Sequence, residues 1–382
     1  MESENDCSLL PPGGNSVILS RRCSILAMMA LTAGLTASST AVSQSGTYRI
    51  IGVGDTMMGS DYPTPVFEAR LTATADPATI IGRELAALLK TGDIVFANYE
   101  GTIHGLAGPA KRCNDPRLCY VFRSPPFHAE TLKRLGFNLV SLANNHSGDF
   151  GDPGRVATFE TFRRIGVAAA GPDRDGMRST VVRLRDGTRV GFAAFGHNPG
   201  LLWLTDIKRA QEVVRDLRGA SDIVLISVHA GAEGANALRV TRATENFVGE
   251  NRGNVWQFAH AVVDAGADVV FGHGPHVPRA VEIYRGKFIA YSLGNFWTYG
   301  RFNLRPPANL APIADVEVDK SGRIRSVRIH SAIQAMPGVP RIDPDQAALK
   351  LIARLTAEDF PEAGIKFLPD GRVSAPGIGR TN

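Results

Sequence analysis

Two histidines lie close together in the stretch FGHGPHV (271–277), directly after an apolar run. His273 and His276 are two of only nine histidines among 382 residues. Imidazole nitrogens bind divalent metal ions and also carry protons in catalysis. Gly272 would let the backbone approach a bound ion without a Cβ, and Pro275 would help to fix the turn between the rings. Either histidine alone could equally be a core residue. The residues at the ends of the other expected strands distinguish a core role from a metal site.

Polar side chains also end the other apolar runs that we expect to be strands. In an open α/β sheet, ligands bind beyond the carboxyl ends of the strands. Imidazole, carboxylate and amide groups together suit Zn, Mn or Fe, and there are more of them than one tetrahedral ion needs. The pattern therefore indicates a metal site, and two ions bridged by a carboxylate fit it better than one. The residues at these strand ends are Asp55, Asn98, Glu100, Asn144, Asn145, His146, His229, His273 and His276.

The elements that must position these side chains alternate along the chain. Short apolar runs with polar corners predict strands, and amphipathic stretches predict helices. Helices are expected at 81–90, 153–166, 254–267 and 343–360, and hairpins at 179–195, 280–296 and 314–330. This mixture predicts an α/β fold, a two-layer β-sandwich flanked by helices with hairpins toward the C-terminus. We expect one domain over residues 45–335, followed by a C-terminal helix and tail over 336–382.

Composition limits the class of protein. The chain is 44% hydrophobic, which is enough to bury a large core, and its formal net charge is +5. This mild basic excess is compatible with an anionic substrate, such as an anionic polymer or a phosphoester. The sequence has no Lys/Arg cluster of the kind that follows a nucleic-acid backbone, so we expect no nucleic-acid partner.

The N-terminus has the features of an export signal. Arg21 and Arg22 precede an apolar run over residues 25–37, which is too short to span a bilayer as a helix. Small residues follow, where a signal peptidase could cut after Ser43. We predict that residues 1–43 are an export signal peptide and that the mature protein is periplasmic or extracellular. The paired arginines favour the twin-arginine route over an ordinary secretory signal.

Cys113 and Cys119 are the two cysteines outside this signal. In an exported protein an even pair of cysteines favours a disulfide, which would stiffen the loop between them. A reduced pair and a metal site that lacks further thiolates are the alternatives.

Several motifs in this order resemble the CapA family, proteins of capsule and poly-γ-glutamate synthesis built on a calcineurin-like metallophosphatase fold. The resemblance covers residues 48–335 and implies an αββα sandwich with a dinuclear metal site. The motifs are Asp55 in its Gly-Asp turn, Asn98-x-Glu100-Gly101, FRSPP from Phe122, LANNH with Asp149 and Gly151, GHGPHV, Glu282-Ile-Tyr, and YSLGNF (291–296).

The resemblance implies a role for each matching residue. Asp55 would bind the first metal, Glu100 would bridge the two ions and Asn145 would bind the second. His146, oriented by Asp149, would protonate a leaving oxygen. The remaining metal ligands would be His229, His273 and His276. Residues that would face substrate or support the site are Asn98, Arg123 and Asn295.

The chain also departs from related phosphoesterases. Met57 stands where they usually carry a histidine two residues after the first aspartate, and Asn98 with Glu100 replaces their second aspartate. The leading hypothesis is an exported metal-dependent hydrolase of a phosphoester or of a γ-glutamyl polymer. The alternative is a non-catalytic component that binds polymer beside membrane proteins of a capsule synthesis or export machine. A serine hydrolase is disfavoured because the sequence has no G-x-S-x-G motif.

Overall fold

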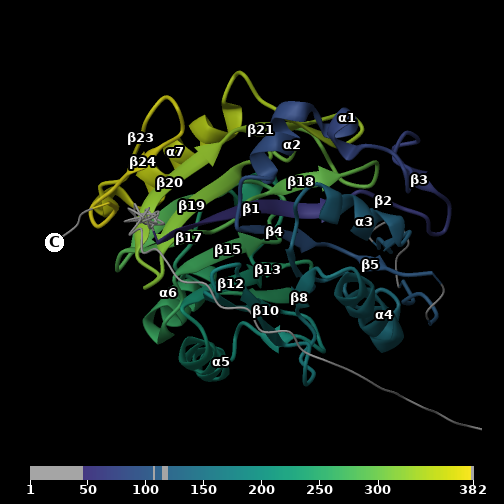
Figure 1. The fold of residues 1–382 in the computed structure, drawn as a ribbon, viewed down its shortest axis with the longest axis horizontal. Coiled ribbons are helices and arrows are strands. Elements are labelled where there is room, and N and C mark those ends of the chain that lie inside the picture. Colours follow the sequence, from purple (N-terminus) through teal and green to yellow (C-terminus); the bar gives the residue numbers. More distant parts are fainter. Residues whose placement is uncertain (1–45, 106–107, 114–118, 380–382) are drawn as a thin grey trace, which may run out of the picture. The chain divides into compact units, whose positions relative to one another are not determined.

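The computed structural model describes residues 46–105, 108–113 and 119–379, so the predicted signal peptide lies outside it. These residues form two seven-stranded sheets and five short two-stranded pairs (Figure 1). The first sheet runs in the order β20 (Ile324–His330), β19 (Ile313–Asp319), β1 (Thr47–Met57), β4 (Ile94–Tyr99), β7 (Leu139–Ser141) and β8 (Ala168–Ala170), with β18 (Asn295–Thr298) also beside β1. The second runs in the order β11 (Leu202–Trp203), β10 (Arg189–Gly196), β12 (Ile223–His229), β15 (Val269–His273), β17 (Lys287–Ala290) and β16 (Val281–Tyr284), with β9 (Ser179–Arg183) beside β10.

Neighbouring residues of one strand face opposite layers. On β1, Ile50 packs between the two sheets, where it joins Phe96 and Phe271 in the central core. Ile51 faces the other way and packs with Leu85 and Leu89 under the helices of the first sheet. This alternation is the period of two that a strand imposes on its side chains.

Helices cover both outer faces of the sandwich. The first sheet is covered by α1 (Pro77–Ile81), α2 (Arg83–Leu89), α3 (Phe127–Arg134) and α4 (Gly151–Arg164). The second is covered by α5 (Ile207–Ala220) and α6 (Val255–Ala265), which lie on its side away from β1 (Figure 1). The structure therefore confirms the predicted sandwich of two sheets flanked by helices.

One predicted hairpin is only partly right. Residues 281–290 do form the hairpin of β16 and β17, but the expected second strand does not continue to residue 296. The chain instead crosses to the first sheet, where β18 pairs in parallel with β1 and Asn295 lies opposite Asp55. Gly54 permits this approach, because a Cβ there would lie 2.2 Å from the carbonyl oxygen of Gly294. A local hydrophobic pattern cannot show that a strand changes sheet.

The C-terminal residues also pack on the sandwich. Ile352 and Leu355 of α7 (Ala347–Asp359) lie in the central core and in the outer core of the second sheet, respectively. The two-stranded pairs are β2 (Gly59–Ser60) with β3 (Val66–Phe67), β5 (Thr102–Ile103) with β6 (Arg123–Ser124), β13 (Glu245–Phe247) with β14 (Glu250–Gly253), β21 (Ala332–Ala335) with β22 (Val339–Ile342), and β23 (Lys366–Phe367) with β24 (Val373–Ser374). In the part of the chain that the structure describes, every helix is too short or too polar to cross a membrane.

Candidate metal centre

Asp55 is at the centre of a buried polar cluster where the parallel strands end. Its side chain is fully buried, and Oδ1 accepts a hydrogen bond from Asn98 Nδ2 at 2.8 Å. His276 Nδ1 lies 2.9 Å from the other oxygen, Oδ2, and His273 Nδ1 lies 3.3 Å from Oδ1. The sheets thus bring together the first strand end and both histidines of the GHGPHV stretch.

Glu100 forms the second carboxylate of this cluster and is also fully buried. Its Oε1 lies 3.5 Å from Nε2 of His276 and 3.9 Å from Nε2 of His229. Asp55, Glu100 and His229 can each offer one ligand atom, and these atoms lie within 4.8 Å of one another. Three ligand atoms at this spacing can converge on a single cation. We call the residues Asp55, Glu100, His229, His273 and His276 the metal group.

Several atoms of the cluster are buried without a hydrogen bond within the described residues. They include both oxygens of Glu100, Nε2 of His229, both ring nitrogens of His273 and Oδ1 of Asn145. Buried polar atoms nearly always have a hydrogen-bond partner. This many exceptions in one place therefore need an explanation. Every one of these atoms can carry a lone pair that a divalent cation accepts, and a cation would also supply positive charge between two carboxylates. The residues present therefore fit a divalent metal.

The electrostatics of the cluster support the same conclusion. Burial alone would raise the pKa of Asp55, but the nearby imidazoles of His273 and His276 hold it well below its ordinary value. Burial raises the pKa of Glu100 well above its ordinary value and lowers the pKa of His229 well below its own. Burial would also lower the pKa of His276, yet the charge of Glu100 and the hydrogen bond to Asp55 raise it to about 10. Burial thus opposes the charged form of Glu100, while neutral His229 keeps a lone pair for a metal.

The neighbouring chain gives one reason for glycine at position 272. A Cβ at Gly272 would lie 2.2 Å from the carbonyl oxygen of Tyr291, so the close approach of that segment requires glycine here. His276 itself has a φ of 57°, in the left-handed region that non-glycine residues rarely adopt. Such a conformation persists only where the surrounding structure holds it, and here it directs the ring toward Asp55.

Asn295 supports His276 from the crossing strand. Its Oδ1 lies 3.1 Å from Nδ1 of His276, and its Nδ2 donates to the carbonyl oxygens of His276 and Ala308. Asn295 therefore orients the histidine. Met57 is buried, and its Sδ accepts a hydrogen bond from the Gly59 amide at 3.2 Å. A thioether thus stands two residues after Asp55, at the position for which the sequence resemblance predicts an imidazole.

His146 and Asp149 form a separate pair in the loop after β7. Nδ1 of His146 lies 2.9 Å from Oδ2 of Asp149, and the amide of Phe122 donates to the same oxygen at 2.7 Å. Asn144 links this loop to β4, because its Nδ2 donates to the carbonyl oxygen of Tyr99 and its Oδ1 accepts from the His146 amide. The pairing leaves Nε2 of His146 as the ring nitrogen available to a substrate.

The only partly accessible members of these two groups are histidines. The side chain of His276 is 16% exposed and that of His146 is 10% exposed, whereas Asp55 and Glu100 are fully buried. Phe122 lies against the His146 ring at 4.2 Å, Phe302 lies against the His276 ring at 5.1 Å, and the two phenyl rings stack at 5.3 Å. The aromatic pair thus connects the two partly exposed histidines.

Arg123 lies apart from the metal group. Its Nε donates to Asp61 at 2.7 Å, and its guanidinium packs over the rings of Tyr62 and Phe150. These contacts occupy the side chain, so its role in this structure is to hold the 60–62 segment. Of the residues proposed to support or face the substrate, Asn98 and Asn295 contact the metal group and Arg123 does not.

Two further residues were missed by sequence reasoning. His197 directly follows β10, is buried, and its ring lies parallel to that of His229 with centroids 6.2 Å apart. Its position after an apolar strand is the same signal that identified His229 and His273, and could have identified it too. Lys111 forms an ion pair with Asp149, with Nζ 2.6 Å from Oδ1. No pattern in the sequence marks Lys111.

The fold and this site place the chain among αββα proteins that carry a cluster of carboxylates and imidazoles at the carboxyl ends of their strands. The model of the bacterial capsule synthesis protein family PGA_cap matches residues 49–299, and the chain belongs to that family. This confirms the resemblance to CapA proteins that the motifs predicted.

Individual relatives agree with the family match. The chain is 26% identical to the capsule biosynthesis protein CapA of Bacillus anthracis over 64% of its length, and 27% identical to the PGA biosynthesis protein CapA of Bacillus subtilis over 65%. These alignments cover 58% and 64% of the two relatives, so the chain matches only part of each. A solved 5'-nucleotidase precursor from Thermus thermophilus is 13% identical with a TM-score of 0.40, covering 83% of this chain and 59% of its own. Because this TM-score is low, the family assignment rests on the sequence match and not on the solved structure.

Proposed function

We propose that the protein is a metal-dependent hydrolase of a phosphoester or of an amide bond in an anionic polymer such as poly-γ-glutamate. One observation carries this proposal: a buried group of unpaired ligand atoms is linked to a histidine–aspartate pair by the stacked rings of Phe122 and Phe302. A ligand group alone could serve to bind, and a histidine pair alone could be structural. Both together are the components of metal-assisted hydrolysis.

The residues of the chain divide this work between them. Asp55, Glu100, His229, His273 and His276 would hold the metal, with Asn145 as a candidate ligand to a second ion. Bound divalent ions lower the pKa of a coordinated water and stabilise charge on the reacting oxygens. Asn98 and Asn295 keep Asp55 and His276 in place.

His146 would act as the general acid. Its Nδ1 is directed at Asp149, which sets the orientation of the ring and leaves Nε2 free for a substrate. A proton held at Nε2 can pass to the leaving oxygen or nitrogen as the scissile bond breaks. Such positioned proton transfer typically contributes about 10²–10⁴ in rate.

The second candidate is a non-catalytic protein that uses the same cluster to bind polymer beside membrane proteins of a capsule machine. Met57 favours it, because a buried thioether replaces one imidazole ligand at the first-metal position. The mild basic net charge suits an anionic polymer under either proposal.

The two candidates differ in metal content and turnover. We would measure Zn, Mn and Fe in the mature protein purified without added metal, then hydrolysis of bis(p-nitrophenyl) phosphate and of poly-γ-glutamate. Glu100→Gln and His273→Gln should lower both metal and turnover, whereas Glu282→Gln should change neither. Glu282 serves as the matched control because it is a buried acid bonded to His260 and Tyr291. Metal-replete protein without turnover on either substrate would favour the binding role.

We also propose that the protein is exported by the twin-arginine route. The motif at Arg21 and Arg22 and the pair of cysteines outside the signal support this proposal. Replacing both arginines with lysine should leave uncleaved precursor in the cytoplasm. Undiminished export of that variant would instead support an ordinary secretory signal.

A further inference from the structure

Asp149 has several polar partners, and most of them come from the segment that contains Lys111 and Phe122. It is fully buried. Besides His146, its Oδ2 accepts the Phe122 amide, and its Oδ1 forms the ion pair with Lys111. The Lys111 amide also donates to the backbone carbonyl oxygen of Asp149 at 2.7 Å. The carboxylate that orients His146 is therefore itself held by two residues of another segment, Lys111 and Phe122.

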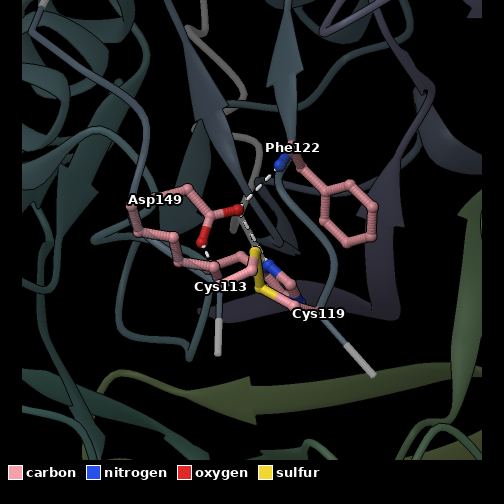
Figure 2. The surroundings of a disulfide bond; sticks show 6 residues. Cys113, Cys119, Phe122 and Asp149 are labelled. Atoms are coloured by element: carbon pink, nitrogen blue, oxygen red, sulfur yellow. Dashed lines mark hydrogen bonds and ion pairs between the residues drawn. A yellow bond between two sulfur atoms is a disulfide. The ribbon is translucent and has the colours of Figure 1, made fainter. Parts of the chain in front are cut away.

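A disulfide closes the chain between Lys111 and Phe122. Cys113 and Cys119 are bonded, with Cα atoms 5.7 Å apart, and Lys111 and Phe122 flank them in sequence. Figure 2 shows the cysteines beside Asp149, with the Phe122 amide directed at the same carboxylate. The covalent closure thus limits how far Lys111 and Phe122 can move apart.

The base of this loop is anchored to the fold as well. Thr102 of β5 donates its amide and its hydroxyl to the carbonyl oxygen of Phe122, at 3.2 and 2.8 Å. The Phe122 ring lies against His146, so Phe122 contacts both members of the pair. The carboxylate contact from Lys111, in contrast, is made by one long side chain, which is 33% exposed. The ammonium group of Lys111 is therefore the part most open to test.

We infer that Lys111, held by the disulfide-closed loop, is a positioning residue for the general acid, acting through Asp149 on His146. This inference rests on the proposed hydrolase function. Lys111 neutralises one oxygen of the buried carboxylate and fixes its plane, so that the other oxygen faces the imidazole. The disulfide keeps the lysine and the Phe122 amide on their two sides of Asp149.

Leaving-group dependence separates this role from a general structural one. We would compare two aryl methyl phosphates, one releasing phenol and the other p-nitrophenol, in wild type and Lys111→Met. Phenolate is a poor leaving group and needs the proton, whereas p-nitrophenolate leaves largely without it. We expect kcat for the phenyl ester to fall about 10-fold to 100-fold and kcat for the p-nitrophenyl ester to change less than about 3-fold, with metal content unchanged. Lys111→Arg should retain most of the phenyl-ester activity.

Two further variants complete the test. Cys113→Ser/Cys119→Ser should show the same selective loss to a smaller degree. Lys287→Met is the matched control, because Lys287 pairs with the buried Asp268 on the second sheet and not with the site. It should lower stability without changing the ratio of the two ester rates. Equal losses on both esters in Lys111→Met, or no loss on either, would overturn the inference.

Amide hydrogen exchange gives a readout that does not need turnover. In Lys111→Met, the amides of residues 146–151 and of 120–124 should exchange faster than in wild type, because their common partner has lost its anchor. Unchanged exchange there would overturn the inference even if the enzyme is active. Wild-type protein without turnover on either ester would count against the proposed function alone, and the exchange result would still decide the role of Lys111.

Discussion

The metal group and the His146–Asp149 pair are built by different means. Asp55, His229 and His273 stand on the ends of β1, β12 and β15, whose register is set by the cores of both sheets. His146 and Asp149 lie in a loop, and their positions depend on a few polar contacts from Asn144, Phe122 and Lys111. The backbone at the strand ends is held mainly by the sheets, whereas the loop depends on these polar contacts.

The difference predicts two kinds of failure. A conservative change in the metal group should remove bound metal while the scaffold stays folded, because the surrounding core is unchanged. A change in the His146–Asp149 pair should keep the metal and weaken only proton transfer. Separating these outcomes is the direct test of whether the cluster and the pair have distinct roles.

The largest effect is expected from Asp55→Asn. The substitution removes the charge that faces His273 and His276, so metal affinity should fall by more than about 100-fold and turnover should be lost with it. Metal stoichiometry after dialysis, with circular dichroism as the fold check, measures this. Asp315→Asn is the control, since Asp315 is a mostly buried aspartate that pairs with Arg49 and His330 instead. Full occupancy in Asp55→Asn would mean that the cluster is not a metal site.

His146→Gln should show the opposite combination. Glutamine keeps a polar side chain but cannot donate a proton as an acid, so kcat should fall by about 10²–10⁴ while metal content remains at the wild-type level. Steady-state kinetics and elemental analysis on the same preparation measure both quantities. A parallel loss of metal would place His146 in the metal group and remove the distinction between the two regions.

Asn295→Ala tests the support of the metal group by the crossing strand. Loss of the contact with His276 Nδ1 should weaken metal binding by about 10-fold to 100-fold, as outer-sphere substitutions typically do. Competition with a chelator of known affinity measures the change, and thermal unfolding shows whether the fold is intact. An unchanged metal affinity would show that the left-handed backbone at His276 is enough to orient the ring.

The smallest effect concerns acid stability outside both regions. His128 in α3 is fully buried between aromatic rings, and burial lowers its pKa to about 3. It stays neutral in the fold but takes up a proton when unfolded, so the stability it supports falls as pH drops below about 6.5 and continues to fall until about pH 3. Between pH 7.5 and 5.5 this costs about 1.4 kcal/mol. His128→Phe should reduce the pH dependence of the unfolding free energy by that amount, as measured by urea denaturation at both pH values. An unchanged dependence would contradict the lowered pKa.

This last measurement sharpens the comparison of the two regions. Activity lost at low pH in wild type but kept in His128→Phe reports the loss of fold. Activity lost equally in both reports titration within the metal group or the His146–Asp149 pair.

Much of the site could be predicted because strand ends leave a local signal. An apolar run that stops at Asp55, His229 or His273 can be seen without any knowledge of distant residues. The same signal at His197 was overlooked, although it was present. Met57 was also visible, because it departs from a motif of known spacing.

Other features have no local signal. Asn295 reaches Asp55 only because its strand leaves the second sheet and joins the first. Glycine is needed at position 272 because the carbonyl oxygen of Tyr291 lies close to it. The role of Lys111 depends on a carboxylate 38 residues later in the chain.

The sequence by itself therefore determined the layers of the fold, the family and the strand-borne members of the metal group, because periodicity and spacing encode what lies within one element. Only the tertiary structure decided how the two sheets converge, which contacts orient His276, and what holds Asp149. These depend on packing and hydrogen bonds between segments far apart in the chain, and a residue's neighbours in sequence do not record its neighbours in space.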